Sequence, residues 1–288
     1  METAQARRTR RREPVLTRRA AAHVGEMAVG GLALILILQA VFRFSILDGT
    51  FWFYYFRFFR TGLFGTLGYV AFIIPVSALV GFLTGWARVS RHRVLVWPAA
   101  VFVDFFRGIP QLIMIIFAFL FAPDFIPQPI MDRLFANVPL RDISVNAAAF
   151  VLALHSGAYQ AEIFRAGFQS VPKGQLEAAQ ALGMRGWQSM RDVVLPQALR
   201  LSLPPLGNEF AVVIKDTSLL AAIAGAELFG KSTDFRGVLA ISGFPLTWMF
   251  AVLTVIALIY FFMTFTVTRI LLVLERRYST PGLEAMSI

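Results

Sequence analysis

The sequence contains six apolar stretches, each long enough to cross a lipid bilayer as an α-helix. A spanning helix needs about 20 mainly apolar residues to cover roughly 30 Å of hydrocarbon at 1.5 Å per residue. The stretches run approximately over residues 27–45, 62–87, 94–122, 143–165, 203–229 and 246–274. Only 15% of the residues are charged, against roughly 25% in soluble domains, which is too few to cover a water-soluble surface of this size. These features predict an all-α polytopic membrane protein with six transmembrane helices.

The fourth and fifth stretches differ from the others because they carry polar and ionisable residues. These are Asn146, His155 and Glu162 in the fourth stretch and Asn208, Glu209, Lys215 and Asp216 in the fifth. A charge at the centre of a lipid-facing helix costs about 2.5 to 3.5 kcal/mol on insertion scales. We therefore expect these two helices to lie in the interior of the protein.

The distribution of basic residues predicts the orientation of the chain. Seven arginines fall within the first nineteen residues, and Lys and Arg recur in the loops at residues 88–93 and 165–200. Because such residues stay on the cytoplasmic side, we expect both termini in the cytoplasm of a cell-membrane protein, with residues 1–26 as a basic tail. The tail suits an anionic lipid leaflet, and no folded basic face accompanies it to suggest a nucleic-acid partner. The aromatic run at residues 51–59 is then expected at the outer membrane interface as a lipid anchor.

Several kinds of chemistry are excluded by composition. The chain has no cysteine, so it has no disulfide, thiolate nucleophile or iron–sulfur cluster. Its three histidines place no two on one helical face, so a histidine-based metal site is not expected. His155 is interpreted as a packed or pore-facing polar residue. The stretch at residues 27–45 is interpreted as a retained helix, because no small-residue cleavage site follows it.

The loop between the fourth and fifth stretches has a strong helical pattern. Its residues 175–182 are good helix formers, Gly183 and Gly186 interrupt them, and an amphipathic pattern resumes at residues 187–194 before Pro196 marks the next boundary. Two short helices are predicted, with the small Ala178 and Ala179 on one side. Such a pair fits a groove of a cytoplasmic partner, but the pattern alone is more typical of a solvated surface helix.

The sequence of this loop resembles the EAA motif of ABC importer permeases. Glu177-Ala178-Ala179 is followed by Gly183 and, after nine intervening residues, by Val193-Val194-Leu195-Pro196. Four further segments resemble the subfamily that imports polar amino acids. They are FRGIP at residues 106–110, SGAYQAEIFR at 156–165, PPLGNEF at 204–210 and KDTSL at 215–219. The resemblance covers residues 61–277 and leaves the helix at residues 27–45 outside the usual five-helix core.

The resemblance implies a type I importer permease, which is a transport subunit and not an enzyme. Two such subunits form the pathway, a dimer of cytoplasmic ABC ATPases drives it, and an extracytoplasmic binding protein delivers the amino acid. ATP and Mg²⁺ are bound by the ATPases, and no cofactor is expected on this chain. The loop at about residues 170–196 would be the ATPase-coupling element. Its matched positions are Glu177, Ala178, Ala179, Gly183, Leu195 and Pro196.

Ionisable residues inside a membrane are functional candidates, because they persist only where they face protein or water. Our candidates for the pathway or gate are Glu162, Asn208, Glu209, Lys215, Asp216, Thr217 and Ser218. Lys215 and Asp216 could mark a locally unwound helix, or they could form a charge pair that holds two helices together. Glu162, Asn208 and Glu209 could also be interfacial. Two departures from the subfamily are Ile109, where Thr is usual, and Glu209, where Gln is common.

One further motif and two alternative functions are compared with the permease interpretation. Residues 225–232 satisfy the P-loop pattern GxxxxGK[ST], but that chemistry needs a strand before the loop, and the predicted topology places Lys231 outside the cell. An intramembrane enzyme would need a catalytic pair, whereas the neighbours His155 and Ser156 diverge by about 100° on a helix. An ATP-independent gated channel or carrier would have no reason to carry the coupling loop. The sequence does not specify which amino acid is transported, whether the two permeases are identical or related, or what form the binding protein takes.

Overall fold

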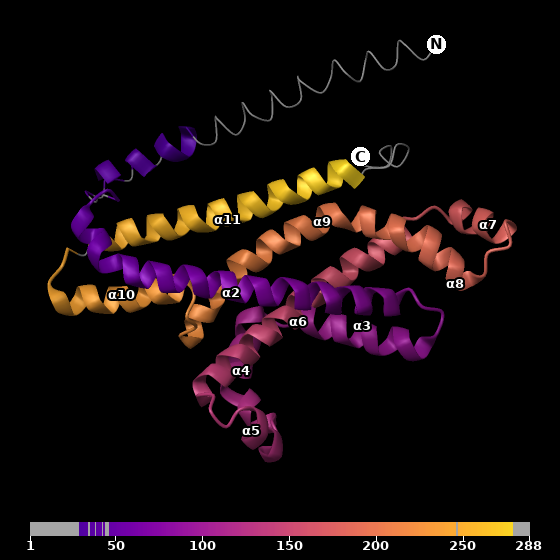
Figure 1. Ribbon diagram of the computed structural model, residues 1–288, viewed down its shortest axis with the longest axis horizontal. Helices are drawn as coiled ribbons and strands as arrows, with labels where there is room; N and C mark the ends of the chain where they lie inside the picture. Colours follow the sequence, from indigo (N-terminus) through magenta and orange to yellow (C-terminus); the bar gives the residue numbers. More distant parts are fainter. Residues whose placement is uncertain are drawn as a thin grey trace, which may run out of the picture. The chain divides into compact units, whose positions relative to one another are not determined.

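The computed structural model (Figure 1) describes residues 29–278, except residues 34, 38, 42, 44, 45 and 246. Within these residues every regular element is a helix, which confirms the all-α class. The α-helices are α2 (Gly49–Arg88), α3 (Arg93–Gly108), α4 (Gln111–Phe121), α5 (Gln128–Leu134), α6 (Leu140–Gln169), α7 (Lys173–Ala181), α8 (Gly186–Gln188), α9 (Leu195–Asp216), α10 (Leu228–Ser242) and α11 (Trp248–Tyr278). Short 3₁₀ helices η1 (Ala122–Phe125) and η3 (Thr217–Ile223) and a π-helical segment η2 (Ser189–Val194) connect them.

The chain divides into two compact units. One contains the described residues up to Tyr54 together with Leu239–Val255, and the other contains Tyr55–Val238 and the described residues from Ile256 onward. In the first unit an aromatic cluster forms around Trp248, whose ring stacks 5.0 Å from that of Phe244 and lies 5.7 Å from that of Phe51. The predicted tail at residues 1–26 lies outside the described residues, and the predicted helix at 27–45 lies only partly within them.

Among the described residues, two helices are long and apolar enough to cross a membrane, namely α2 and the Trp248–Leu271 part of α11. The α3–α4 pair could provide a third span, although its two helices are bent by 101°. The prediction of six spans is therefore not confirmed. Helix α2 also begins well before residue 62, and the aromatic run at 51–59 is part of it. That run is not only a lipid anchor, because Tyr55 is fully buried and donates or accepts a 2.8 Å hydrogen bond with Ser232.

The third predicted stretch is not one helix. Helix α3 ends at Gly108, Ile109 is extended with φ −110° and ψ 135°, and α4 starts after Pro110. A residue before proline is pushed out of the helical region, and proline has no N–H to continue the helical ladder. The fifth predicted stretch is also interrupted, because α9 ends at Asp216 and the chain continues as η3.

Helix α6 is the centre of the larger unit and packs against α3, α4 and α9. Its buried positions include Ala148, Leu152 and Ala153, which form one hydrophobic core with α2, α4 and η3. Helix α9 buries one face but exposes Asn208 and Lys215, so the prediction of an interior helix is confirmed for the fourth stretch and only in part for the fifth.

Glycines allow α2 to approach α6 closely. A Cβ atom on Gly81 would lie 2.6 Å from the Cβ of Gln160, and one on Gly85 would lie 2.7 Å from the carbonyl oxygen of Ala161. These two glycines are four residues apart and share one helical face, which is the small-residue spacing that brings membrane helices together. The contact continues at the end of α2, where Arg88 forms an ion pair with Glu162.

Candidate functional site

The loop between α6 and α9 is built as two helical segments around Gly183, as predicted. Helix α7 ends in a left-handed glycine, since φ is +81° at Gly183. The Gly183 N–H donates to the Gln180 carbonyl at 2.9 Å, and the Met184 N–H donates to the Ala179 carbonyl at 3.1 Å. This pair of bonds is the Schellman arrangement that closes a helix C-terminus, and it favours glycine because a Cβ is strained at positive φ.

The surface of α7 offers part of the predicted motif to a partner. Glu177 and Ala178 are exposed, whereas Ala179 is only 4% exposed. The prediction that both alanines face one side is wrong, because successive residues diverge by about 100° on a helix. Ala179 packs within this chain. Two large apolar side chains are exposed close by, with Leu182 at 84% and Trp187 at 62% of their full area.

The segment that follows Gly183 runs without a break into α9. Residues 186–216 are helical throughout, and the boundary predicted at Pro196 falls where the π-helical segment η2 ends and α9 begins at Leu195. The turn before this proline is π-helical, and the Leu195 N–H donates to the carbonyl of Met190, five residues earlier. A wider turn of this kind accommodates a proline that cannot donate to the helical ladder. Leu195 and Pro196 are therefore half-buried helix residues at the base of the loop.

Aromatic packing attaches the loop to the transmembrane helices. The Trp187 ring stacks on that of Trp86 in α2, with centroids 6.0 Å apart and planes at 22°. Trp86 also lies 6.0 Å from Phe168 of α6 and 5.3 Å from Phe82. The loop therefore contacts α2 directly and is linked to α6 through the Trp86 ring.

Three of the predicted pathway residues lie at the junction of α9 and η3. Lys215 is exposed, Asp216 is half-buried and hydrogen-bonded to the Gln111 side chain, and Thr217 is fully buried. Thr217 Oγ1 donates to the Ile214 carbonyl at 2.7 Å, which fixes the point where the helix tightens. The chain at Lys215 and Asp216 is therefore not unwound but passes from α-helix into the tighter 3₁₀ helix η3. Ser218 follows in η3 and is half-buried.

The remaining candidates lie elsewhere on α6 and α9. The Glu162 carboxylate forms ion pairs with Arg88 and with Arg165, which lies 2.6 Å away. Glu209 accepts a 3.1 Å hydrogen bond from Ser156, whose hydroxyl accepts one from Gln160, and Asn208 is exposed. The fully buried Gln160 also donates to Ser77 at 2.8 Å, so a chain of polar contacts joins α2, α6 and α9. The sequence analysis did not identify Gln160.

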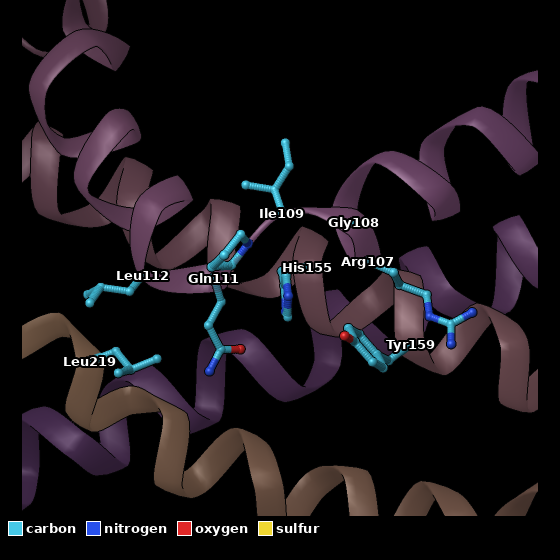
Figure 2. A pocket seen from close by; sticks show the side chains of 9 residues that line it. Arg107, Gly108, Ile109, Gln111, Leu112, His155, Tyr159 and Leu219 are labelled. Carbon is cyan, nitrogen blue, oxygen red and sulfur yellow. The ribbon is translucent and has the colours of Figure 1, made fainter.

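A pocket of about 580 Å³ lies where the α3–α4 bend faces α6. Its lining residues are Arg107, Gly108, Ile109, Pro110, Gln111, Leu112, His155, Tyr159 and Leu219. Figure 2 shows the side chains of Gln111, His155, Tyr159 and Arg107 along one side of the bend, whereas Ile109 points the other way. The sequence signal for this pocket was an arginine inside an apolar stretch, next to a glycine and a proline. None of the seven pathway candidates lines it.

The P-loop-like segment serves a different purpose. The Glu227 carboxylate accepts hydrogen bonds from the backbone N–H groups of Phe229, at 2.7 Å, and Gly230, and from the Tyr260 hydroxyl at 2.9 Å. These N–H groups are the ones that would face a phosphate in a P-loop, and η3 precedes them in place of a strand. The chain's own carboxylate therefore occupies the position of the anion.

The architecture is that of a membrane-embedded helical transport subunit with one exposed helical loop. Residues 77–280 match the family model described as "Binding-protein-dependent transport system inner membrane component". The chain belongs to this family.

Individual relatives agree with this assignment. The L-cystine transport system permease protein TcyB of Bacillus subtilis (strain 168) is 36% identical over 217 residues, which cover 73% of this chain and 85% of the relative. The glutamine transport system permease protein GlnP of Escherichia coli (strain K12) is 35% identical over 204 residues, covering 69% and 83%. A crystal structure of an amino acid ABC transporter with histidines superposes with a TM-score of 0.62 at 31% identity, covering 80% of this chain and 99% of that one.

Proposed function

We propose that this chain is the permease subunit of an ATP-driven, binding-protein-dependent importer of polar amino acids. The support is the family membership together with relatives whose names specify cystine, glutamate, glutamine and arginine. The transported class then includes acidic, amide and basic amino acids. The proposed assembly contains a dimer of cytoplasmic ABC ATPases, a second permease that is either the same chain or a relative, and an extracytoplasmic binding protein.

The observation that carries this proposal is the geometry of the loop at residues 170–196. It presents Glu177 and Ala178 on an exposed helix that a left-handed glycine terminates, and it exposes Leu182. Large exposed apolar side chains beside a charged residue are typical of a surface that a partner covers. A channel or carrier that works without ATP has no use for such a surface.

The proposed orientation places both termini and this loop in the cytoplasm, with the chain in the cell membrane. ATP and Mg²⁺ bind the ATPase subunits, and this chain holds no cofactor of its own. The pathway runs beside the α9–η3 junction, where Lys215, Asp216, Thr217 and Ser218 follow one another. Helix breaks inside a membrane place backbone polar groups beside a polar solute, which supports this position.

Co-purification of the chain with its ATPase tests the proposal. The tagged permease is isolated from its host in mild detergent, and the accompanying subunits are identified and counted by mass spectrometry. We expect an ABC ATPase with the wild type and its loss with Glu177→Lys. Asp132→Lys is the matched control, because it makes the same charge change at an exposed position of α5. A wild-type chain that emerges without an ATPase, under conditions that preserve other membrane complexes, would contradict the proposal and favour an ATP-independent channel.

A further inference from the structure

The pocket at the α3–α4 bend has a charge distribution that selects a particular ligand. Its lining includes one guanidinium, from Arg107, and no carboxylate. The other polar lining side chains are Gln111, His155 and Tyr159. An ionisable side chain at membrane depth is retained when it faces water, a partner or a ligand. A pocket that contributes a positive charge without a negative one is suited to an anion.

The side chain of Arg107 lies over an aromatic ring. Its guanidinium carbon lies 5.1 Å from the centroid of the Tyr159 ring. In the part of the chain that the structure describes, no ion pair within 4.0 Å involves Arg107. A contact with a ring face uses none of the five guanidinium N–H donors, so these stay available for a planar carboxylate, which arginine binds through two parallel bonds.

Two of the nearby carboxylates have hydrogen-bond or ion-pair partners other than Arg107. Glu162, three residues after Tyr159, is bound by Arg88 and Arg165, and Asp216 is hydrogen-bonded to Gln111. The Gln111 side chain is thereby positioned at the pocket by a residue of the α9–η3 junction. His155 is 8% exposed, and its ring lies 5.1 Å from that of Tyr159. The Tyr159 ring is therefore packed between His155 and Arg107.

The geometry points to a carboxylate-binding site in this pocket, with Arg107 as the residue that binds the carboxylate of the transported solute. A volume of about 580 Å³ is within the range of small-molecule sites. The inference rests on the proposed function only for the identity of the solute. It explains how one pocket serves acidic, amide and basic amino acids, since all of them share the α-carboxylate. Side-chain selection is then left to other parts of the transporter.

Equilibrium binding to the full permease in nanodiscs tests the site. The probes are two pairs that differ by a carboxylate, L-glutamate with 4-aminobutyrate and L-arginine with agmatine. We expect wild type to bind at least one of the two amino acids at least about tenfold more tightly than its decarboxylated counterpart, as loss of a charged hydrogen-bond partner predicts. Arg107→Gln abolishes this preference and Arg107→Lys reduces it. Arg133→Gln, at an exposed position of α5 outside the pocket, retains it.

The other outcomes overturn the site. Binding of neither amino acid by the wild type, equal binding of each pair, or an unchanged preference in Arg107→Gln would exclude carboxylate recognition by Arg107. A lipid phosphate is the other anion available at this depth, so the measurement is repeated with zwitterionic and with anionic lipid. Loss of amino-acid binding in anionic lipid alone would make Arg107 a lipid site. ATP-driven uptake by the assembled transporter is measured in parallel, so failure of the site and failure of the proposed function are distinguished.

Discussion

Single residues determine whether the exposed loop has the shape that a partner needs, and Gly183 is the clearest case. Its φ of +81° favours glycine. We expect Gly183→Ala to destabilise the end of α7 by about 1 to 2 kcal/mol, the cost of a side chain in the left-handed region. ATPase binding and uptake should fall together. Gly186→Ala is the control, because a Cβ there meets nothing within 4 Å. Equal activity of the two variants would show that the turn is not required.

Glu227 is a second residue-scale test, because it separates a structural role from nucleotide binding. The fully buried carboxylate accepts bonds from two backbone N–H groups and from Tyr260. Glu227→Gln directs an amide N–H₂ at these donors, so we expect thermal stability in detergent to fall by about 1 to 3 kcal/mol. Lys231→Ala should leave ATP-driven uptake unchanged. A loss of ATP binding by the complex in Lys231→Ala, with stability intact, would restore the P-loop interpretation.

At the scale of elements, the close packing of α2 on α6 predicts a graded response at the glycines of α2. A Cβ on Gly81 would approach the Cβ of Gln160 to 2.6 Å, whereas one on Gly68 would meet nothing within 4 Å. Gly81→Ala should therefore cost about 1 to 3 kcal/mol through overpacking. Gly68→Ala should be neutral or slightly stabilising, because alanine favours the helix. Thermal unfolding of the two variants in the same detergent makes the comparison, and equal melting temperatures would contradict the packing.

The stack between Trp187 and Trp86 predicts how motion passes from the loop to the membrane helices. Aromatic pairs contribute about 0.5 to 1.5 kcal/mol beyond burial. We expect Trp187→Ala to keep the bound ATPase but to lower the solute transported per ATP hydrolysed. Trp86→Ala should do the same, and the double variant should add little. If Trp187→Ala instead releases the ATPase, its ring belongs to the docking surface and not to the link.

The sequence predicted which segments are helical better than it predicted where each helix begins and ends, and particular residues explain the difference. Arg57 and Arg60 lower the hydropathy of residues 51–61, so the apolar stretch begins later than helix α2 does. The bend at Ile109 follows from a local proline rule, but a 20-residue hydropathy window averages over it. The turn at Gly183 was predictable because it depends on neighbouring residues alone. The pocket was not predictable in this way, because Arg107 and His155 line one cavity only when α6 packs on α3 and α4.

At the scale of the whole molecule, three features serve transport together only when this chain is assembled with its partners. They are the loop, the α9–η3 junction and the pocket. The larger unit contains all three, with α6 between them. The loop contacts α2 through the Trp187–Trp86 stack, Trp86 packs on Phe168 of α6, and α6 contributes His155 and Tyr159 to the pocket. A displacement imposed on the loop by an ATPase can therefore reach the pocket through one packed helix pair. The central claim is that solute movement through this chain is driven by ATP.

The most direct test is uptake of a labelled amino acid by proteoliposomes that contain this chain, its ATPase, any second permease and the binding protein. We expect accumulation against a gradient that requires ATP on the side of the loop and that stops when the ATPase is inactivated. Glu177→Lys should abolish accumulation, whereas Asp132→Lys should not. Equilibration of the label without ATP, at the same rate in wild type and Glu177→Lys, would contradict the account and identify a passive pathway.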